Sequence, residues 1–445
     1  MDALKVVKFS ELPNWSVQYT DVTDIGFTKK YPMVKIGMFL ETGRDVAEIQ
    51  DDVEYKQITL KINNGGVVPR NNGATILGST IGTKRQKYIH SGQFIMSKID
   101  ARNGAYGIVP ENLDGAIVTN DFPIFNVDEK QIIPQYLVLI STTKNFITFA
   151  QKCSSGTTNR KRIDIDSFLL QKIPLPSKPQ QEEIIARYNQ TISEATRKEE
   201  SATQLEDDIE KYLFKALGIY LDNRRTFTNK TLQIIRYSNL DRWDAYGTDN
   251  SFSAALKKSD YPITPIGKVF DFITRTWDKI EPTFKYVEIG SVDPLLGIVH
   301  TEEIETKKAP SRATQIIREG DLILGTTRPY LKKFAIVDSQ HDGHICSSGF
   351  QVIAPNKDTN VEFLYEYLKS SIAIAQFEFY MTGALYPAIT IKDLKKILIP
   401  LPPIDIQNSI VEHINEMKSQ IKLLKQQAAD LRAQALKDFE KEIFE

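Results

Sequence analysis

The tetrapeptide Ile173-Pro174-Leu175-Pro176 occurs a second time as Ile399-Pro400-Leu401-Pro402, and a long polar segment follows each copy. Proline ends a strand and restricts the residue before it, so each tetrapeptide predicts a boundary between a domain and a helix. The residues upstream also recur, 228 positions apart, and the spacing falls to 226 between Phe350 and Ile399, so the second copy lacks two residues. Matching positions are Trp15 and Trp243, Gly92 and Gly320, Ile108 and Ile336, Asp114 and Asp342, and Phe122 and Phe350.

The composition is that of a soluble globular protein. Of the 445 residues, 41% are hydrophobic and 25% are charged, and no apolar run is long enough to cross a membrane. The first residues lack the apolar core of a signal peptide, and Cys153 and Cys346 form no pair motif, so we expect a reduced, cytoplasmic protein. The net charge of −1 argues weakly against nucleic acid, but acidic residues gather in 180–211 and leave basic patches available elsewhere.

Each copy begins with a domain of mixed secondary structure, which we place at residues 1–176 and 227–402. In the first copy, short β-rich runs alternate with turn signals such as Asn71-Asn72-Gly73, and residues 134–150 have the apolar spacing of a helix. The second copy repeats this order, with a helix near residues 361–377. The sequence therefore predicts two duplicated mixed α/β (α+β) domains.

Residues 177–226 and 403–445 each predict a long helix. Ser177 with Gln180 fits a capping box, and Gly218 is a good helix terminator. Apolar residues in both segments alternate spacings of four and three, a heptad pattern that predicts one buried stripe on each helix. The stripe residues are Ile184, Tyr188, Ala195, Ala202, Leu205 and Ile209 in the first helix and Ile410, Ile414, Met417, Ile421, Leu424, Ala428, Leu431 and Ala435 in the second. We expect an antiparallel coiled coil; the alternative is that each helix packs only on its own domain.

Two sets of motifs stand at equivalent places in the copies. The first copy contains Ser91–Val109, Ser154–Arg162 and, after the proline boundary, Gln180–Ile184. The second copy answers with Glu319–Arg328 and with Thr382-Gly383 before its own boundary. Together, in this order and with a heptad helix after each copy, they resemble the DNA-specificity (S) subunits of type I restriction-modification systems over essentially the whole chain.

The resemblance implies a layout of four parts and a division of labour. Residues 1–176 and 227–402 would be target-recognition domains, each reading one half of a bipartite target in double-stranded DNA. Residues 177–226 and 403–445 would be spacer helices that fix the separation of the half-sites and dock two modification subunits. Those subunits would bring S-adenosylmethionine and methylate adenine, restriction subunits would bring ATP and Mg chemistry, and this chain would hold no cofactor and catalyse nothing.

Basic and polar side chains in three segments of the first copy are candidates for DNA contact. Cations neutralise phosphates, Arg and Gln reach base edges in bidentate fashion, and a glycine such as Gly156 permits close approach to a phosphate. The alternatives are a solvated charged loop for the first segment and a turn-capping role for the second. The candidates are Lys84, Arg85, Gln86 and Lys87; Lys98, Arg102 and Asn103; and Thr157, Thr158, Asn159, Arg160, Lys161 and Arg162.

The second copy has its own candidates at matching places. Its loop at Met381–Pro387 keeps a glycine but has no cation, so the inference there is weaker. Arg275 and Trp277 could contribute to a site there, and the alternative for Trp277 is that it is a core residue. Because the copies differ most in these segments, we expect the two domains to read different sequences. The candidates are Arg275, Arg312, Thr327, Arg328, Tyr330, Lys332 and Lys333.

Catalytic motifs are missing from the sequence. It contains no Asn-Pro-Pro-Tyr methyltransferase motif, no Gly-x-Gly-x-x-Gly after a strand, no P-loop of correct spacing and no metal-ligand spacing among its five histidines and two cysteines. A non-catalytic DNA reader is the leading hypothesis. Two others remain: a specificity subunit that serves a fused modification-cleavage polypeptide, and a coiled-coil scaffold that binds no DNA.

Overall fold

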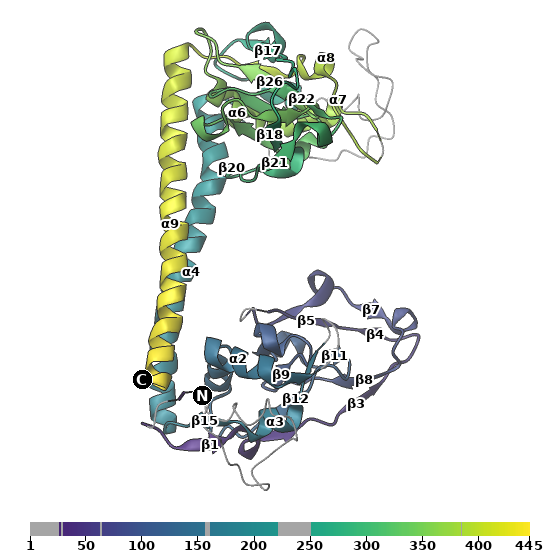
Figure 1. The fold of residues 1–445 in the computed structure, drawn as a ribbon, viewed down its shortest axis with the longest axis vertical. Coiled ribbons are helices and arrows are strands. Elements are labelled where there is room, and N and C mark those ends of the chain that lie inside the picture. Colours follow the sequence, from purple (N-terminus) through teal and green to yellow (C-terminus); the bar gives the residue numbers. More distant parts are fainter. Residues whose placement is uncertain (1–25, 28–29, 63–64, 156–160, 221–250, 384) are drawn as a thin grey trace. The chain divides into compact units, whose positions relative to one another are not determined.

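The computed structural model describes residues 26–27, 30–62, 65–155, 161–220, 251–383 and 385–445, so Trp15 and Trp243 lie outside the described residues. The chain divides into two compact units, Met1–Glu199 with Gln426–Glu445, and Glu200–Lys425. Each unit contains one α/β domain and a part of both long helices (Figure 1). This division cuts through the helices, so the domain boundaries at 176, 226 and 402 stay a prediction.

The first domain combines short strands with three helices. Its helices are α1 (Pro134–Ser141), α2 (Lys144–Lys152) and α3 (Ile165–Leu170). Its strands are β1 (Met33–Lys35), β2 (Leu40–Thr42), β3 (Val46–Glu48), β4 (Glu54–Tyr55), β5 (Ile58–Leu60), β6 (Val67–Pro69), β7 (Ile76–Leu77), β8 (Arg85–Tyr88), β9 (Phe94–Met96), β10 (Tyr106–Ile108), β11 (Ile117–Val118), β12 (Ile124–Val127), β13 (Ser154–Ser155), β14 (Arg162–Ile163) and β15 (Lys172–Pro174). The main sheets have the orders β10-β9-β12-β2 and β11-β8-β3.

The second domain repeats this mixture. Its helices are α5 (Ser251–Leu256), α6 (Val361–Leu368), α7 (Ser371–Tyr380) and α8 (Ile391–Leu394). Its strands are β16 (Ile263–Pro265), β17 (Asp271–Ile273), β18 (Thr283–Val287), β19 (Val292–Asp293), β20 (Gly297–Ile298), β21 (Glu302–Glu305), β22 (Ala313–Ile316), β23 (Leu322–Gly325), β24 (Phe334–Ile336), β25 (Ile345–Ser347), β26 (Phe350–Ala354) and β27 (Leu398–Pro400). The main sheets have the orders β24-β23-β26-β17 and β21-β18-β25-β22.

The central sheets of the two domains have the same strand order. Strands β10, β9, β12 and β2 of the first domain correspond to β24, β23, β26 and β17 of the second. The pairing register is also the same, because Phe94 pairs with Phe125 and Leu322, 228 positions after Phe94, pairs with Ile353. The prediction of two duplicated mixed α/β domains is therefore confirmed.

The single helix predicted in each domain is two helices, and this prediction was wrong. In the first domain the chain breaks between α1 and α2, where the Thr143 hydroxyl accepts a hydrogen bond from the backbone N–H of Phe146. In the second it breaks between α6 and α7, where Ser370 accepts from Ala373 N–H. A hydroxyl cap satisfies an N–H group at a helix start and contributes about 1 kcal/mol, so it supports a new helix inside a continuous apolar pattern.

The two missing residues of the second copy are lost in two steps. The difference in residue number between equivalent positions of the two copies is 228 at the residues of β26 that pair with β23. It is 227 at the helix caps Thr143 and Ser370. It is 226 at Ile163 and Ile389, whose backbone N–H groups make equivalent hydrogen bonds. The second step therefore falls between the cap of α7 and Ile389, where the second domain has a shorter loop.

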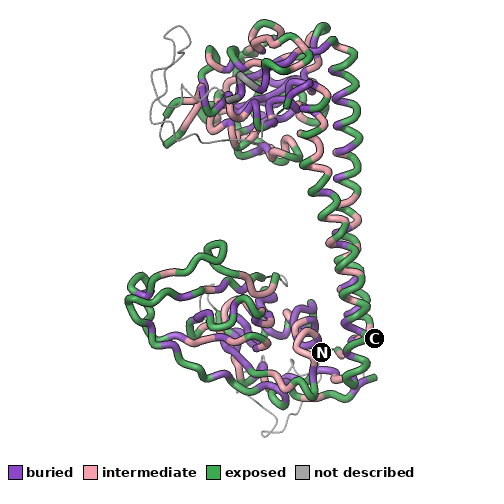
Figure 2. The backbone as a smooth tube through the Cα atoms, turned by 180° about the vertical axis from the view of Figure 1, so that it is seen from behind, coloured by how far each residue is buried: buried purple, intermediate pink, exposed green. Residues whose placement is uncertain are grey.

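Helices α4 (Lys178–Ala216) and α9 (Ile404–Phe444) are the two long helices that the heptads predict. The Ser177 N–H donates to the Gln180 side chain at the start of α4, and Gly218, with φ of +64°, follows its end. The buried side follows the predicted stripe: all of its positions are buried or half-buried (Figure 2). Among the described residues, no helix has the length and apolar content of a membrane span.

In each unit the two long helices run antiparallel. As residue numbers rise along α4, those of the partners on α9 fall. In the first unit Arg187 pairs with Glu442 and Glu199 with Arg432; in the second, Glu206 pairs with Lys425 and the ring of Tyr212 contacts that of His413. The antiparallel pairing expected from the heptads is therefore present within both units.

Each domain packs on both helices. The core of the first domain includes Ile184 and Ile185 of α4 together with Phe439 and Ile443 of α9. The core of the second includes residues near the end of α4 and the start of α9, namely Leu213, Leu217, Ile410 and Ile414. The alternative that each helix packs only on its own domain is therefore wrong, because an α/β core supplies part of the apolar cover for both helices.

Candidate nucleic-acid interface

A turn after β9 joins three segments of the first domain that are far apart in sequence. The backbone N–H of Lys98 donates to the carbonyl of Asp121 over 2.8 Å. The N–H of Ile163, in β14, donates to the carbonyl of Lys98 over 2.9 Å. The turn with Lys98 and the loop that ends at Arg162 therefore lie side by side, so the structure brings two of the three predicted segments together.

Arg162 forms a bidentate ion pair in this region. Its Nε and Nη2 donate to the two carboxylate oxygens of Asp121 over 3.0 and 3.1 Å, and Asp121 raises the pKa of Arg162. Both side chains are partly exposed, and exposed ion pairs are weak, so a phosphate can compete for the guanidinium. Lys161 is exposed beside it. The other predicted residues of this loop, Thr157, Thr158, Asn159 and Arg160, lie outside the described residues.

The charge of Lys98, in this turn, acts on a second lysine. Lys87 of β8 is half-buried, and its burial lowers its pKa; the nearby charge of Lys98 lowers that pKa further. Two like charges at one place destabilise each other, and a bound anion would relieve the repulsion. Lys87 and Lys98 are therefore suitable ligands for a phosphate.

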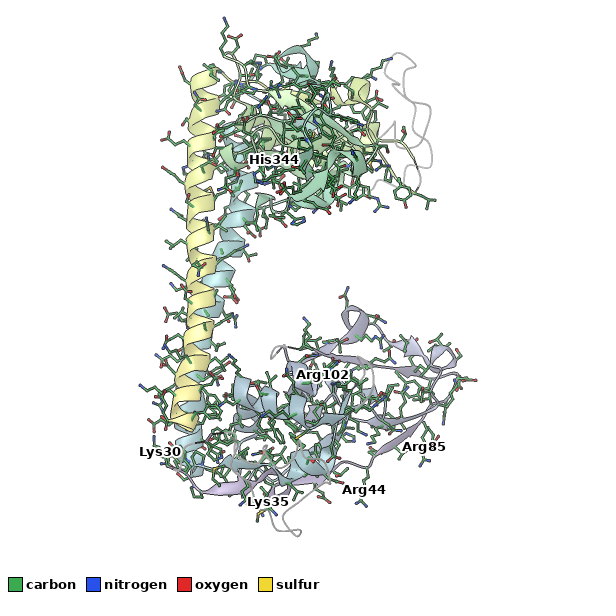
Figure 3. The ribbon with its side chains drawn as sticks, viewed as in Figure 1. Lys30, Lys35, Arg44, Arg85, Arg102 and His344 are labelled. Atoms are coloured by element: carbon green, nitrogen blue, oxygen red, sulfur yellow. The ribbon has the colours of Figure 1, made fainter. Side chains whose placement is uncertain are left out.

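The segment Lys84–Lys87 does not act as one basic patch, because the strand sends alternate side chains to opposite faces. Gln86 is only 4% exposed and donates to the carbonyl of Thr83, which gives it a structural role, and its contact with DNA stays a prediction. Lys84 pairs with Asp51, and Arg85 pairs with Glu48 over 3.5 Å. Figure 3 shows Arg85 on β8 and Arg102 at a separate place on the domain.

Arg102 and Asn103 lie in a short 3-10 turn after Asp100. The Asn103 amide donates to the Asp100 carboxylate over 3.2 Å, and Gln151 of α2 donates to the Arg102 carbonyl over 3.0 Å. Gly104 closes the turn with φ of +77°. The Asn103 side chain thus binds another side chain of the turn, and its exposed position leaves it within reach of a ligand.

The second domain has the same backbone arrangement with different side chains. The N–H of Thr326 donates to the carbonyl of Gly349 over 2.9 Å, and the N–H of Ile389 donates to the carbonyl of Thr326 over 3.0 Å. Thr326 stands where the first domain has Lys98, and Gly349 stands where it has Asp121. Since glycine has no carboxylate, the ion pair that Arg162 forms has no equivalent here.

Arg328 is the best-fixed cation of the second turn. Its backbone N–H donates to the Pro387 carbonyl over 2.7 Å and its Nη2 donates to the Leu385 carbonyl over 3.0 Å. Its guanidinium carbon lies 5.1 Å from the centre of the Tyr386 ring, within the range of a cation–π interaction. Arg328 and Lys332 both have left-handed backbone, with φ of 49° and 54°.

The remaining candidates of the second domain surround this turn. Thr327 forms a backbone bridge with Ala388, and the Lys333 ammonium donates to the carbonyl of Val292 over 2.6 Å. Tyr330 and Lys332 are half-buried in the turn itself, and Arg312 is exposed just before β22. The structure therefore groups Thr327, Arg328, Tyr330, Lys332 and Lys333, while Arg312 lies outside this turn, just before β22.

Arg275 is held by a buried carboxylate, and its contact with DNA stays a prediction. Its guanidinium makes a bidentate ion pair with Asp321, whose side chain is fully buried. A buried carboxylate needs such a partner, so Arg275 stabilises the fold, while its own side chain remains one-third exposed (33%). Trp277 is buried against Phe284 and is a core residue, as its alternative held. Among the described residues, no group of three His, Cys, Asp or Glu side chains could hold a metal ion.

Sequence reasoning missed three residues of this region. Asp121 gave no signal because only the fold places it beside Arg162. Leu385 and Tyr386 were not named as candidates for DNA contact, because their loop contains no cation to neutralise a phosphate. Both side chains are largely exposed, and an exposed apolar group beside this turn is a candidate for contact with a ligand.

Comparisons with known proteins agree with the duplication. The sequence model of a family described as "Type I restriction modification DNA specificity domain" matches residues 23–206 and again residues 258–433. The specificity subunit of the type I restriction enzyme HindI from Haemophilus influenzae is 27% identical over 186 residues. The match covers 40% of this chain and 40% of that relative, so the chain spans about two-fifths of the curated relative's length.

Solved structures are similar in fold. One, from a study of complex assembly and conformational transition of the type I R-M system, has a TM-score of 0.55 and 18% identity, covering 93% of this chain and 97% of that one. The HsdS subunit from Thermoanaerobacter tengcongensis has a TM-score of 0.41 and 16% identity, over 94% and 97% of the two chains. The first of these likenesses supports the two-domain fold that the register of the central sheets also indicates.

Proposed function

The chain belongs to the type I restriction modification DNA specificity domain family, and from this we propose that it is the DNA-reading subunit of such a system. Each α/β domain would read one half of a bipartite target in double-stranded DNA. The observation that supports this most directly is the pair of equivalent turns, Lys98 with its loop and Thr326 with its loop, which share backbone hydrogen bonds and differ in side chains. Two domains that bind different half-sites need the same backbone arrangement with different exposed side chains.

In the first domain, phosphate contacts would set the register on DNA. Lys87 and Lys98 repel each other in the free protein, and Lys161 and Arg162 are exposed beside them. Phosphate contacts fix position and orientation, while contacts with base edges read sequence. Arg102 and Asn103, in the adjacent turn, are the side chains of this domain that we assign to base edges.

The long helices would join this reader to the rest of the complex. We propose that they fix the distance between half-sites and dock two modification subunits, with restriction subunits added outside them. Those partners would supply S-adenosylmethionine, ATP and Mg, and this chain would act in the cytoplasm without a cofactor of its own. Adenine methylation requires the base to leave the helix stack, so DNA bound by this chain must tolerate local distortion.

A domain exchange tests the modular function. We expect that replacing residues 227–402 with the corresponding domain of another family member changes one half of the methylated motif and leaves the other half as it was. Methylome sequencing of cells that contain the modification subunits and either version of the chain measures this. The spacing of the two half-sites, set by unchanged helices, serves as the internal control. A change in both halves, or in neither, would contradict the proposal.

A further inference from the structure

Two adjacent apolar side chains stand exposed at the loop of the second domain. Leu385 is 81% exposed and Tyr386 is 73% exposed, and Leu331 in the neighbouring turn is 46% exposed. Single exposed apolar residues are common, but a leucine beside a tyrosine with both side chains in water costs hydration free energy. Because this group lies beside the turn that we assign to DNA, it is a candidate for a surface that a ligand covers.

The base of this loop is firmly held. Thr382 and Ala388 exchange both of their backbone hydrogen bonds, each 2.9 Å long, and the next residue, Ile389, donates to Thr326. The first domain closes its loop in the same way, because Ser154 pairs with Ile163 and Ser155 with Arg162. The exposed pair is therefore presented at a fixed place, next to the turn that we assign to DNA.

Arg328 holds the tip of this loop, residues Leu385 and Tyr386, from one side. It binds the carbonyls of Pro387 and Leu385, and its guanidinium lies against the ring of Tyr386. Its left-handed backbone is uncommon for a residue other than glycine, and its Nε is buried with no hydrogen-bond partner among the described residues. Surroundings that impose such a conformation often do so at functional sites. With Arg328 against the ring and most of the side chain exposed, Tyr386 is suited to stack on a second flat group.

We propose that Leu385 and Tyr386 form an apolar wedge that enters duplex DNA at an unstacked base step, with the Tyr386 ring stacked on a base. Leucine and aromatic side chains are known to part base steps in this way, and stacking on an aromatic ring depends little on base identity. The loop from Thr382 to Pro387 contains no acidic residue that would repel the backbone phosphates. This inference rests on the proposed function, because the wedge would act where a partner extrudes a base.

Binding and fluorescence together test the wedge. The probe is the duplex that the full-length wild-type chain enriches from a random-sequence library, with 2-aminopurine placed in turn at each position. We expect the double variant Leu385→Ala/Tyr386→Ala to bind this duplex about ten- to a hundred-fold more weakly, which corresponds to one or two stacking contacts. The slope of log K against log salt should stay unchanged, and one 2-aminopurine position should lose the fluorescence change that the wild type causes. Tyr386→Phe should keep both.

A matched control changes a second pair of adjacent, exposed apolar side chains in the same domain. Leu295 and Leu296, on the β19–β20 hairpin, are 63% and 78% exposed, so their change to alanine removes a similar apolar area. This control should bind as the wild type does, and equal thermal midpoints should show that both variants fold. Unchanged binding and fluorescence in the Leu385→Ala/Tyr386→Ala variant would overturn the wedge. So would unchanged DNA binding with loss of a modification subunit, which would make the tip a protein-docking surface. If the wild type enriched no duplex, the proposed function itself would fail.

Discussion

The loops Cys153–Ile163 and Met381–Ile389 occupy the same place in the two domains and differ in nearly everything else. Both end at an isoleucine whose N–H binds the carbonyl of the turn after the central strand. The first has three consecutive cations, residues 160–162, whereas the second has Leu385 and Tyr386. The fold therefore sets where each loop is presented, while the side chains of the loop set whether it acts by charge or by apolar contact.

The largest effect is expected at a buried position where the domains differ. Gln93 of the first domain is neutral and donates to Asn126, whereas Asp321, at the same place in the second, is charged and held by Arg275. Because Arg275→Met would leave a buried carboxylate without its cation, we expect it to lower the free energy of unfolding by about 3–5 kcal/mol. Denaturant titration of the full chain measures this.

The control for this prediction is Arg318→Met. Arg318 pairs with Asp342 over 3.3 Å, but both side chains are well exposed, so the change should cost less than about 1 kcal/mol. Equal losses for the two variants would mean that Asp321 does not depend on Arg275, and the contrast with Gln93 would have no energetic meaning.

The next effect concerns the charged loop. We expect Lys161→Glu/Arg162→Glu to weaken binding to the enriched duplex by on the order of tenfold at low salt, because attraction to the phosphates is replaced by repulsion. The slope of log K against log salt should fall by roughly 0.9 for each phosphate that the variant no longer neutralises. Lys172→Glu/Lys178→Glu, two exposed lysines at the boundary of β15 and α4, makes the same charge change away from the loop. A control with the same decrease in slope would show that net charge alone acts, without a local site.

The smallest effect is expected in the core, at Tyr106. Its hydroxyl is fully buried with no hydrogen-bond partner among the described residues, and the equivalent residue of the second domain is Phe334. A buried polar group without a partner destabilises the fold, so Tyr106→Phe should raise the free energy of unfolding by about 1 kcal/mol. Tyr367→Phe, which removes a hydroxyl bound to the Leu398 carbonyl over 2.7 Å, should lower it by a similar amount. A loss of stability in Tyr106→Phe would reveal a partner for that hydroxyl.

Much of the fold could be predicted from repeating patterns. The heptads placed the buried stripe of both long helices correctly, since a stripe of apolar residues must be covered wherever a helix forms. The break at Thr143 could not be predicted in this way, because the apolar spacing continues across it and only the cap reveals a second helix start. Periodicity reports which face is buried and says little about where a helix is interrupted.

The candidate site could be predicted only in part. Lys98 and Arg162 could be named as candidates because cations near turns are visible in a sequence. The hydrogen bond of Gln86 with the Thr83 carbonyl and the ion pair of Arg275 with Asp321 could not be inferred, because burial and long-range partners depend on the fold. Tyr386 was missed because its loop was judged by its lack of cations.

The duplication, the two helices and the proline boundaries follow from the amino-acid sequence alone, because repeats, heptads and proline geometry act over short distances along the chain. Folding is what closes each domain on the start of one long helix and the end of the other. Folding also decides which cations gain an acidic partner, as Arg162 does in Asp121, and which act on each other by charge, as Lys98 does on Lys87. Charge and exposure depend on neighbours brought from distant positions, and only the folded chain supplies those neighbours.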